Sequence, residues 1–313
     1  MTSRIGLLGG RGYVGEELLR LLCAIPEYSP VYIGSHSSAG QALTDQYPDL
    51  PLELTFQDLS PESLSRATVD FWIIAQANGV ADSYVQELNK LGRPRIIDIS
   101  SDFRFDEQWT YGLAEANELA IRESDFVSNP GCYATATQLA LLPIVGQLRS
   151  TPSAFGVSGY SGAGRTPNER NDPKRLADNL LPYSLIGHTH EKEVSHHLKR
   201  DVRFMPHVAS FFRGISVTVD IELQEPTDVE SLQDQYTQFY ARHALVEVSQ
   251  AVPEIKQVTN TNGAVVGGFH VNPTNPCRVA IVSVIDNLRK GAASQVIQNL
   301  NLMNGLESTH GLI

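Results

Sequence analysis

Strand-like apolar runs alternate with helical segments through residues 1–131. The run RIGLL (4–8) predicts a buried strand, and beyond a glycine turn the leucines of EELLRLLCAI recur at helical spacing. The run VYIGS (31–35) predicts a second strand and completes a β-α-β unit. Two more strands are predicted at 70–77 and 95–100, with a helix at 80–90 between them. This alternation predicts a parallel, doubly wound α/β sheet.

The pattern changes after the segment NPGCYATA. A glycine- and serine-rich loop (158–165) leads into a polar stretch with little periodicity. The segment GISVTVDIEL (214–223) then alternates strictly, which predicts a half-buried antiparallel strand, and VAIVSVID (279–286) predicts another strand. The chain finishes with a predicted helix that is stopped by Gly305, and its apolar positions are Val296, Ile297, Leu300 and Met303.

Length and composition narrow the class of protein. A chain of 313 residues exceeds what one core usually organises, so two domains are expected. The net charge of −11, without a cluster of Lys and Arg, argues against nucleic acid as a partner. The three cysteines form no CxxC pair, and no apolar stretch reaches the length of a membrane span. We therefore expect a cytoplasmic protein in a reducing compartment.

The glycine turn after the first strand carries a dinucleotide-binding pattern. Gly10, Gly12 and Gly15 satisfy GxGxxG, and Gly9 with Gly12 and Gly15 satisfies GxxGxxG. Small residues let the backbone approach a pyrophosphate at the start of a helix, although a turn without a ligand can look the same. The pattern predicts a Rossmann domain of residues 1–131, completed by residues 287–313, with an α+β domain of residues 132–286 inserted.

The segment after the second strand favours NADP over NAD. An NAD-selective site usually places Asp or Glu there, for the ribose 2′-hydroxyl. This chain instead reads Ser35, His36, Ser37 and Ser38. Hydroxyl groups without a nearby carboxylate suit a 2′-phosphate, and Arg11 in the glycine turn is a candidate cation.

Cys132 is the candidate nucleophile. Pro130 and Gly131 form a turn before it, and the residues after it predict the start of a helix. Unpaired backbone N–H groups at a helix start lower a thiol pKa and can bind an oxyanion. By contrast, Cys23 lies inside an apolar helix, where a structural role is expected, and Cys277 precedes a strand.

Histidines and arginines supply the remaining candidates. His188 and His190 are predicted to lie in a glycine-led loop before a helix, whereas His196 and His197 fall inside a charged helix and are expected to face solvent. No HExxH or paired-cysteine spacing is present, so no metal site is predicted. The loop-like arginines, suited to a phosphate or carboxylate, are Arg104, Arg165 and Arg213.

Taken together, these motifs resemble those of the N-acetyl-γ-glutamyl-phosphate reductases. The runs GGRGYVG, SSDFR, YGLAE, NPGCYATA, SGYSGAGR, GHTHEKEV, PHVASFFRGI and DNLRKGAASQVIQN occur in that family's order over nearly the whole chain. The resemblance implies a Rossmann domain plus an α+β catalytic domain of the semialdehyde dehydrogenase type. It also implies NADPH-dependent reduction of N-acetyl-L-glutamyl 5-phosphate to the 5-semialdehyde and phosphate in arginine biosynthesis, by a homo-oligomer (dimer or tetramer).

The resemblance assigns roles to individual residues. Cys132 would be the nucleophile and His190 the acid and base. The implied substrate-binding residues are Arg104, Asn129, Ser158, Arg165, His188, Glu193 and Arg213. Which arginine meets the carboxylate and which the phosphoryl group is left open. The expected NADP-binding residues are Gly9, Gly10, Arg11, Gly12, Tyr13, Val14, Ser35, Ser37, Ser38, Asn287 and Lys290.

Three positions depart from the family pattern. Lys192 replaces the proline of HxHxPE, His36 stands where an arginine often follows the second strand, and Ser294 replaces the second glycine of GAAGQ. None of these changes removes a reacting group, and they bear mainly on cofactor preference.

The implied mechanism passes through a thioester. The Cys132 thiolate attacks the acyl carbonyl and expels phosphate, the thioester accepts hydride from the nicotinamide, and His190 assists collapse of the thiohemiacetal to the aldehyde. Two alternatives stay open. One is a carrier-protein-linked aminoadipyl-phosphate reductase of lysine biosynthesis, and the other is a non-catalytic NADP-sensing protein.

Overall fold

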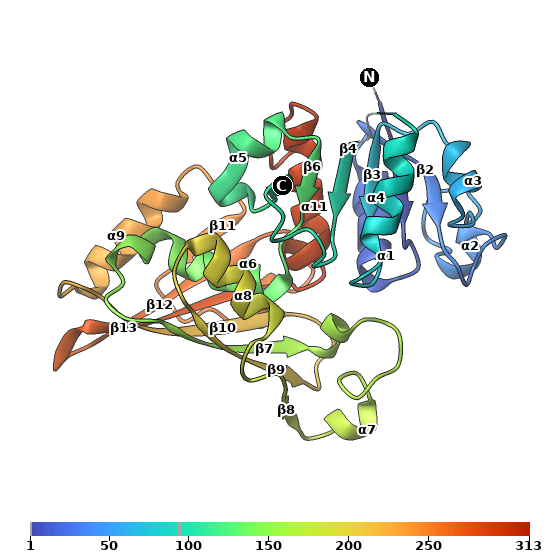
Figure 1. Ribbon diagram of the computed structural model, residues 1–313. Helices are drawn as coiled ribbons and strands as arrows, with labels where there is room; N and C mark the ends of the chain where they lie inside the picture. Colours follow the sequence, from blue (N-terminus) through green and yellow to red (C-terminus); the bar gives the residue numbers. More distant parts are fainter. Residues whose placement is uncertain (1, 93–94) are drawn as a thin grey trace. The chain divides into compact units, whose positions relative to one another are not determined.

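The chain forms two compact units, shown in Figure 1. The computed structural model describes residues 2–92 and 95–313. One unit contains the residues up to 130 together with 292–313, and the other contains residues 131–291. The chain therefore passes from one unit to the other between Pro130 and Gly131, and back between Gly291 and Ala292.

A parallel sheet forms the centre of the first unit. Its strands, in spatial order, are β2 (Tyr28–Gly34), β1 (Ser3–Leu8), β3 (Phe71–Ile74), β4 (Arg95–Asp98), β6 (Phe126–Ser128) and β5 (Thr110–Tyr111). Each neighbouring pair is parallel, which confirms the predicted doubly wound sheet. The helices of this unit are α1 (Tyr13–Ala24), α2 (Leu43–Gln46), α3 (Pro61–Ser65), α4 (Ala81–Lys90), α5 (Ala114–Glu123) and α11 (Ser294–Met303).

Helix α11 is buried on every side although half of its residues are polar. All residues from Ser294 to Met303 are buried. Their amides find internal partners, because the Gln295 carboxamide donates to the Gly112 carbonyl at 2.8 Å and the Asn299 carboxamide donates to the Asn129 side chain at 3.1 Å. Buried polar groups are tolerated when they are paired in this way. The helix thus fixes Asn129, three residues before Cys132.

A mixed sheet organises the second unit. Its strands, in spatial order, are β11 (Val246–Ser249), β12 (Ala264–Asn272), β13 (Asn275–Ile285), β10 (Ile215–Glu222), β7 (Ser153–Gly159), β9 (Arg203–Ala209) and β8 (Leu180–Pro182). Strand β10 is antiparallel to both of its neighbours, β13 and β7, which confirms the strand predicted from strict alternation.

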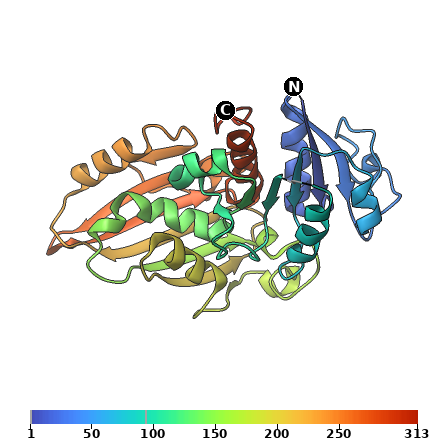
Figure 2. The same cartoon turned by 45° about the horizontal axis from the view of Figure 1, so that its top comes forward.

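The larger core lies on one face of this sheet, and a smaller cluster of Val258, Val265 and Val284 lies on the other. On β10, Ile215, Val217, Val219 and Ile221 are buried, whereas Thr218 and Asp220, on the other face, are exposed. Helices α6 (Cys132–Leu141), α8 (Thr189–Leu198) and α9 (Val229–Tyr240) cover the apolar face, as Figure 2 shows. The shorter helices are α7 (Pro173–Leu176) and α10 (Ile255–Val258). Among the described helices, none has the length and apolarity needed to cross a membrane.

Candidate active site

Three glycines between β1 and α1 and one in the first turn of α1 have different structural roles. Gly9 has a φ of +104°, which favours glycine. A Cβ on Gly15 would lie 2.5 Å from the Gly9 carbonyl oxygen, so helix and turn pack too closely for a side chain, and Gly10 is crowded by Ile33. At Gly12 a Cβ would meet nothing nearer than 3.8 Å. Gly12 is also the N-cap of α1 and supplies no side-chain cap, so the helix start is left open to a phosphate.

The loop after β2 brings hydroxyl groups and a guanidinium together. Arg11 donates to the Ser37 hydroxyl at 2.6 Å, and the Ser35 hydroxyl accepts from the Ser38 N–H at 3.3 Å. His36 lies 3.0 Å from the Tyr84 hydroxyl. No carboxylate stands in the loop segment Ser35–Ser38. Hydroxyl groups and a guanidinium are groups that can hold a phosphate, and a preference for NADP over NAD stays a prediction.

Cys132 occupies the first turn of α6. Gly131 is the N-cap and offers no side-chain cap, and its carbonyl accepts the first helical hydrogen bond, from Thr135 N–H, at 2.8 Å. The predicted helix start at Cys132 is confirmed. The carboxylate of Glu193, a fully buried residue of α8, accepts the Gly131 N–H at 2.8 Å. Glu193 therefore holds the peptide directly before Cys132, the predicted nucleophile.

Gly291 packs directly against Cys132. A Cβ at Gly291 would lie 2.7 Å from the Cys132 Cβ and 3.3 Å from the Asp286 carbonyl oxygen. The Gly291 N–H already donates to that carbonyl at 2.9 Å. Gly291 belongs to a π-helical turn, Arg289–Ala293, a kind of irregularity that often occurs at functional sites. A side chain at position 291 therefore has no room beside Cys132.

The two histidines predicted to lie in a loop belong to a helix start. Helix α8 begins at Thr189, so the prediction that His190 precedes the helix was wrong. His188 is the N-cap, and its Nδ1 accepts the His190 N–H at 3.1 Å, a capping role that histidine rarely signals in sequence. Burial, and after it the charge of Arg170, holds the pKa of His188 below its ordinary value. An uncharged ring is what this acceptor role requires.

Ring contacts connect the start of α8 with the neighbour of Cys132. The His188 and His190 rings lie edge to face, 4.9 Å apart, and His190 lies 6.0 Å from the ring of Tyr133, the neighbour of Cys132. Tyr183 lies edge-on to His188 at 5.4 Å. Burial and, after it, the negative charge of the Cys132 thiolate raise the pKa of Tyr183 to about 12. These residues thus share one site.

Two members of this site were missed in the sequence. The guanidinium of Arg170 lies over the Tyr183 ring, 5.0 Å from its centre. Arg170 stands in the polar run NERNDPKR, and Tyr183 stands between Pro182 and Ser184, so neither shows a motif. Their proximity arises from the fold, and no local spacing could have indicated it.

The predicted substrate-binding arginines differ in their surroundings. Arg104, 7% exposed, donates to the carbonyls of Asn129 and Ile99 at 3.0 and 2.8 Å. Arg213 forms an ion pair with the buried Asp286 at 2.7 Å. Arg165 follows Gly164, whose φ is +82°. Arg104 thus ties together two backbone segments, and Arg213 neutralises a buried carboxylate. Contact with a substrate stays a prediction for all three arginines.

The other predicted residues are also placed. Ser158 is buried at the end of β7 and donates to the Gly159 carbonyl at 2.9 Å. The Asn287 carboxamide accepts from Gly214 N–H at 2.7 Å and donates to the Ser161 hydroxyl at 2.9 Å, and Lys290 is buried. Asn287 and Lys290 belong to the second unit, so their contact with a cofactor stays a prediction. Among the described residues, no group of three or more His, Cys, Asp or Glu could hold a metal ion.

Comparisons with known proteins agree over both units. Residues 4–124 match the semialdehyde dehydrogenase NAD binding domain, and residues 132–287 match the semialdehyde dehydrogenase dimerisation domain. Aspartate semialdehyde dehydrogenase II from Vibrio cholerae superposes with a TM-score of 0.80 at 18% identity, covering 97% of this chain and 99% of that one. The enzyme from Candida albicans gives 0.77 at 14% identity, with the same two coverages. At these identities the likeness shows the fold.

Curated relatives are much closer in sequence. The chain is 44% identical over 305 residues to N-acetyl-gamma-glutamyl-phosphate reductase of Xanthomonas campestris pv. campestris (strain B100), covering 97% of this chain and 96% of that protein. The corresponding protein of Stenotrophomonas maltophilia is 42% identical, with coverages of 98% and 96%. The match to the bifunctional protein argC, mitochondrial, of Dictyostelium discoideum is 42% identical and spans 36% of that longer protein. The chain therefore belongs to the semialdehyde dehydrogenase family, among its N-acetyl-γ-glutamyl-phosphate reductases.

Proposed function

We propose that this chain reduces N-acetyl-L-glutamyl 5-phosphate to N-acetyl-L-glutamate 5-semialdehyde and phosphate, with NADPH as reductant, in the cytoplasmic synthesis of arginine. The observation that carries the proposal is Cys132 in the first turn of α6, beside the histidines that open α8. The near full-length identity to relatives of that name supports the choice of substrate.

Each step of the reaction has a candidate residue. The Cys132 sulfur attacks the acyl carbonyl, the carbon–oxygen bond to phosphate breaks, and a thioester forms. Backbone N–H groups in the first turn of α6 stabilise the oxyanion that develops on the carbonyl oxygen. After reduction, the carbon–sulfur bond breaks, the aldehyde leaves, and Cys132 is regenerated as the thiolate. His190 holds and returns the proton at the carbonyl oxygen during these changes.

The residues of the first unit fit a dinucleotide phosphate. Gly12 leaves the start of α1 open to a pyrophosphate, and Arg11 with Ser37 offers donors to a 2′-phosphate. When bound, NADPH supplies the hydride that reduces the thioester. We propose NADPH as the preferred cofactor because no carboxylate in Ser35–Ser38 would repel the extra phosphate.

Replacing Arg11 by glutamine tests this preference. Loss of one charge-assisted hydrogen bond to a phosphate should weaken NADPH binding by about 10- to 100-fold. NADH binding should change little, since NADH has no 2′-phosphate. Fluorescence titration of both nucleotides measures the two dissociation constants, and Arg66→Gln on the same unit is the control for lost charge. Equal loss of affinity for both nucleotides would contradict the assignment of Arg11.

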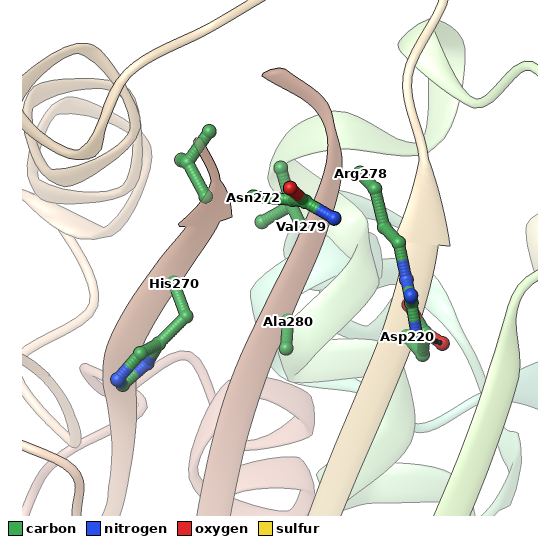
Figure 3. Close-up of a pocket in the computed structure, with 7 residues that line it drawn as sticks. Asp220, His270, Asn272, Arg278, Val279 and Ala280 are labelled. Atoms are coloured by element: carbon green, nitrogen blue, oxygen red, sulfur yellow. Dashed lines mark hydrogen bonds and ion pairs between the residues drawn. The ribbon is translucent and has the colours of Figure 1, made fainter. Parts of the chain in front are cut away.

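We also propose that two copies pair through the sheet face of the second unit that lies opposite α6, α8 and α9 and is covered only in part, by α10. The register across strands β9, β7, β10 and β13 places Met205, Phe155, Thr218 and Val282 in one row on this face. Phe155 is 40% exposed. A polar rim follows, where Asp220 and Arg278 pair at 2.9 Å beside a hollow of about 320 Å³ that His270 borders (Figure 3). An apolar centre with a polar rim is typical of an interface, and a second copy is the occupant because these residues match a dimerisation domain.

The substitution Phe155→Asp tests the pairing. Burial of an unpaired carboxylate should raise the dimer dissociation constant by at least about 100-fold, so the variant should sediment as a monomer at micromolar concentration. Leu119→Asp, at an exposed position of α5 in the first unit, should leave the oligomer intact. Sedimentation velocity measures the outcome, and circular dichroism checks the fold. A Phe155→Asp protein that remains dimeric would rule out this face.

One assay tests the reaction itself. NADPH formation should follow from N-acetylglutamate 5-semialdehyde, phosphate and NADP, in the reverse direction, and should vanish when phosphate is omitted. Activity with the free semialdehyde also separates this function from a carrier-linked reductase, which requires a carrier-bound substrate. Binding of NADPH without turnover of this substrate would contradict the proposal.

A further inference from the structure

The loop that carries Arg170 is cross-linked by two asparagine side chains. The Asn168 carboxamide accepts the Arg170 N–H at 3.0 Å and donates to the Ala163 carbonyl at 3.1 Å. The Asn171 carboxamide donates to the carbonyls of Gly164 and Thr166 at 2.9 and 2.8 Å. Such bonds from asparagine to nearby backbone stabilise a defined loop conformation. The backbone of Arg170 is therefore held in place.

The Arg170 side chain continues a chain of planar groups that ends at His190. Its guanidinium lies 5.0 Å from the centre of the Tyr183 ring, Tyr183 lies edge-on to His188, and His188 lies edge-on to His190. A ring covers only one face of a guanidinium. One hydrogen bond joins Arg170 to the Tyr183 side chain, which leaves the other N–H groups of the guanidinium available. Arg170 is exposed, whereas Tyr183, His188 and His190 are half-buried. The cation thus lies at the outer side of the histidine cluster.

No ion pair neutralises the charge of Arg170 within residues 2–92 and 95–313. The adjacent Glu169 pairs with Arg175 at 2.6 Å instead. By contrast, Arg213 is neutralised by Asp286, and Arg104 is occupied by backbone carbonyls. A cation that binds an anionic substrate needs open N–H groups and an uncompensated charge.

We propose that Arg170 binds the free carboxylate of the substrate at the outer edge of the Cys132 site, with Tyr183 as the platform for the guanidinium. The inference rests on the proposed function and names the residue that selects the carboxylate. The phosphoryl group is bonded to the reacting carbonyl and must lie next to Cys132, whereas the carboxylate is several bonds away. A cation at the outer side of the histidine cluster is therefore placed to bind the carboxylate.

The reverse reaction tests the proposal because it separates the two anions. In that direction the semialdehyde carries the carboxylate and phosphate is a second substrate. Arg170→Gln should raise KM for the semialdehyde by about 10- to 100-fold and leave KM for phosphate unchanged. Lys174→Gln, which removes an exposed charge from the same segment, should change neither value, and Arg170→Lys should restore part of the loss. If Arg170→Gln raised only the KM for phosphate, or changed neither KM, the proposal would be overturned.

Alkylation of the thiol gives a readout that does not depend on turnover. Iodoacetate carries a carboxylate and iodoacetamide does not. The rate of Cys132 alkylation by iodoacetate, divided by the rate with iodoacetamide, should fall by about 3- to 10-fold in Arg170→Gln at low salt. The same ratio should stay unchanged in Lys174→Gln. An unchanged ratio in Arg170→Gln would overturn the proposal even if the enzyme reduced a different acyl phosphate. A lowered ratio together with no turnover of the semialdehyde would instead reject the proposed function alone.

Discussion

Replacing Cys132 by serine is expected to lower kcat by at least roughly 1,000-fold, because the thioester is the intermediate that accepts hydride. A serine hydroxyl is almost entirely protonated at neutral pH and is a much weaker nucleophile than a thiolate. The helix start that surrounds the residue would remain, since Glu193 and Thr135 hold Gly131 through backbone atoms. Steady-state kinetics in both directions measure the loss.

Binding of the cofactor separates this chemical effect from misfolding. Cys132→Ser should bind NADPH with the affinity of the natural protein, because the glycine turn and the Ser35–Ser38 loop belong to the other unit. Cys277→Ser, at a half-exposed cysteine in β13, should keep full activity. Substantial turnover by the Cys132→Ser protein would refute the assignment of the nucleophile.

Gly291→Ala should also lower activity strongly, although it changes no reacting group. The added Cβ would lie 2.7 Å from the Cys132 Cβ, well inside van der Waals contact, so one of the two backbones must move. Neither moves easily, because Glu193 holds Gly131 and the Gly291 N–H is bonded to Asp286. A displacement of the nucleophile by about 1 Å is expected to lower kcat/KM by roughly 100-fold, and overpacking should cost about 1–3 kcal/mol of unfolding free energy.

Gly146→Ala is the matched control. It makes the same chemical change in the same unit, where a Cβ meets nothing within 4 Å and φ is not positive. The control should keep wild-type kinetics and thermal stability. Kinetics, thermal melting and the alkylation rate of Cys132 measure both variants. If Gly291→Ala gave the same kinetics, melting temperature and alkylation rate as Gly146→Ala, the tight packing at Cys132 would not matter for activity.

The secondary structure was predictable wherever apolar periodicity was strong. The alternation in GISVTVDIEL indicated β10 to within a residue at each end, and the continuous run FWII is buried throughout, as in a parallel sheet. The start of α6 at Cys132 was equally clear, because Pro130 and Gly131 end the preceding segment.

Helix α11 and the start of α8 show where local patterns stop being informative. A pattern of apolar positions describes one buried face, but α11 is buried all round because its amides pair with partners such as Gly112 and Asn129, far away in the sequence. The start of α8 was misplaced because a histidine replaces the usual capping residue.

The sequence indicated candidates for the site but not how they are arranged. It pointed to Cys132 and the histidines because few residue types can act as a nucleophile or as its acid–base partner, and these stand in recognisable motifs; their catalytic roles stay predictions. Arg170, Tyr183 and Gly291 could not be found in this way, since their importance lies in contacts with residues distant in sequence or in the absence of a side chain. Arg213 was a candidate from the sequence, but its ion pair with the buried Asp286, 73 residues away, was not predictable.

Cys132 is expected to carry the acyl group of the substrate as a thioester during the reaction. The protein is mixed with N-acetylglutamyl phosphate in the absence of NADPH, quenched in acid, and analysed by intact mass and peptide mapping. The account predicts one N-acetylglutamyl adduct per chain, on the peptide that contains Cys132, released by hydroxylamine and reduced to semialdehyde when NADPH is added before quenching. An adduct on another residue, or normal turnover without any adduct on Cys132, would contradict it.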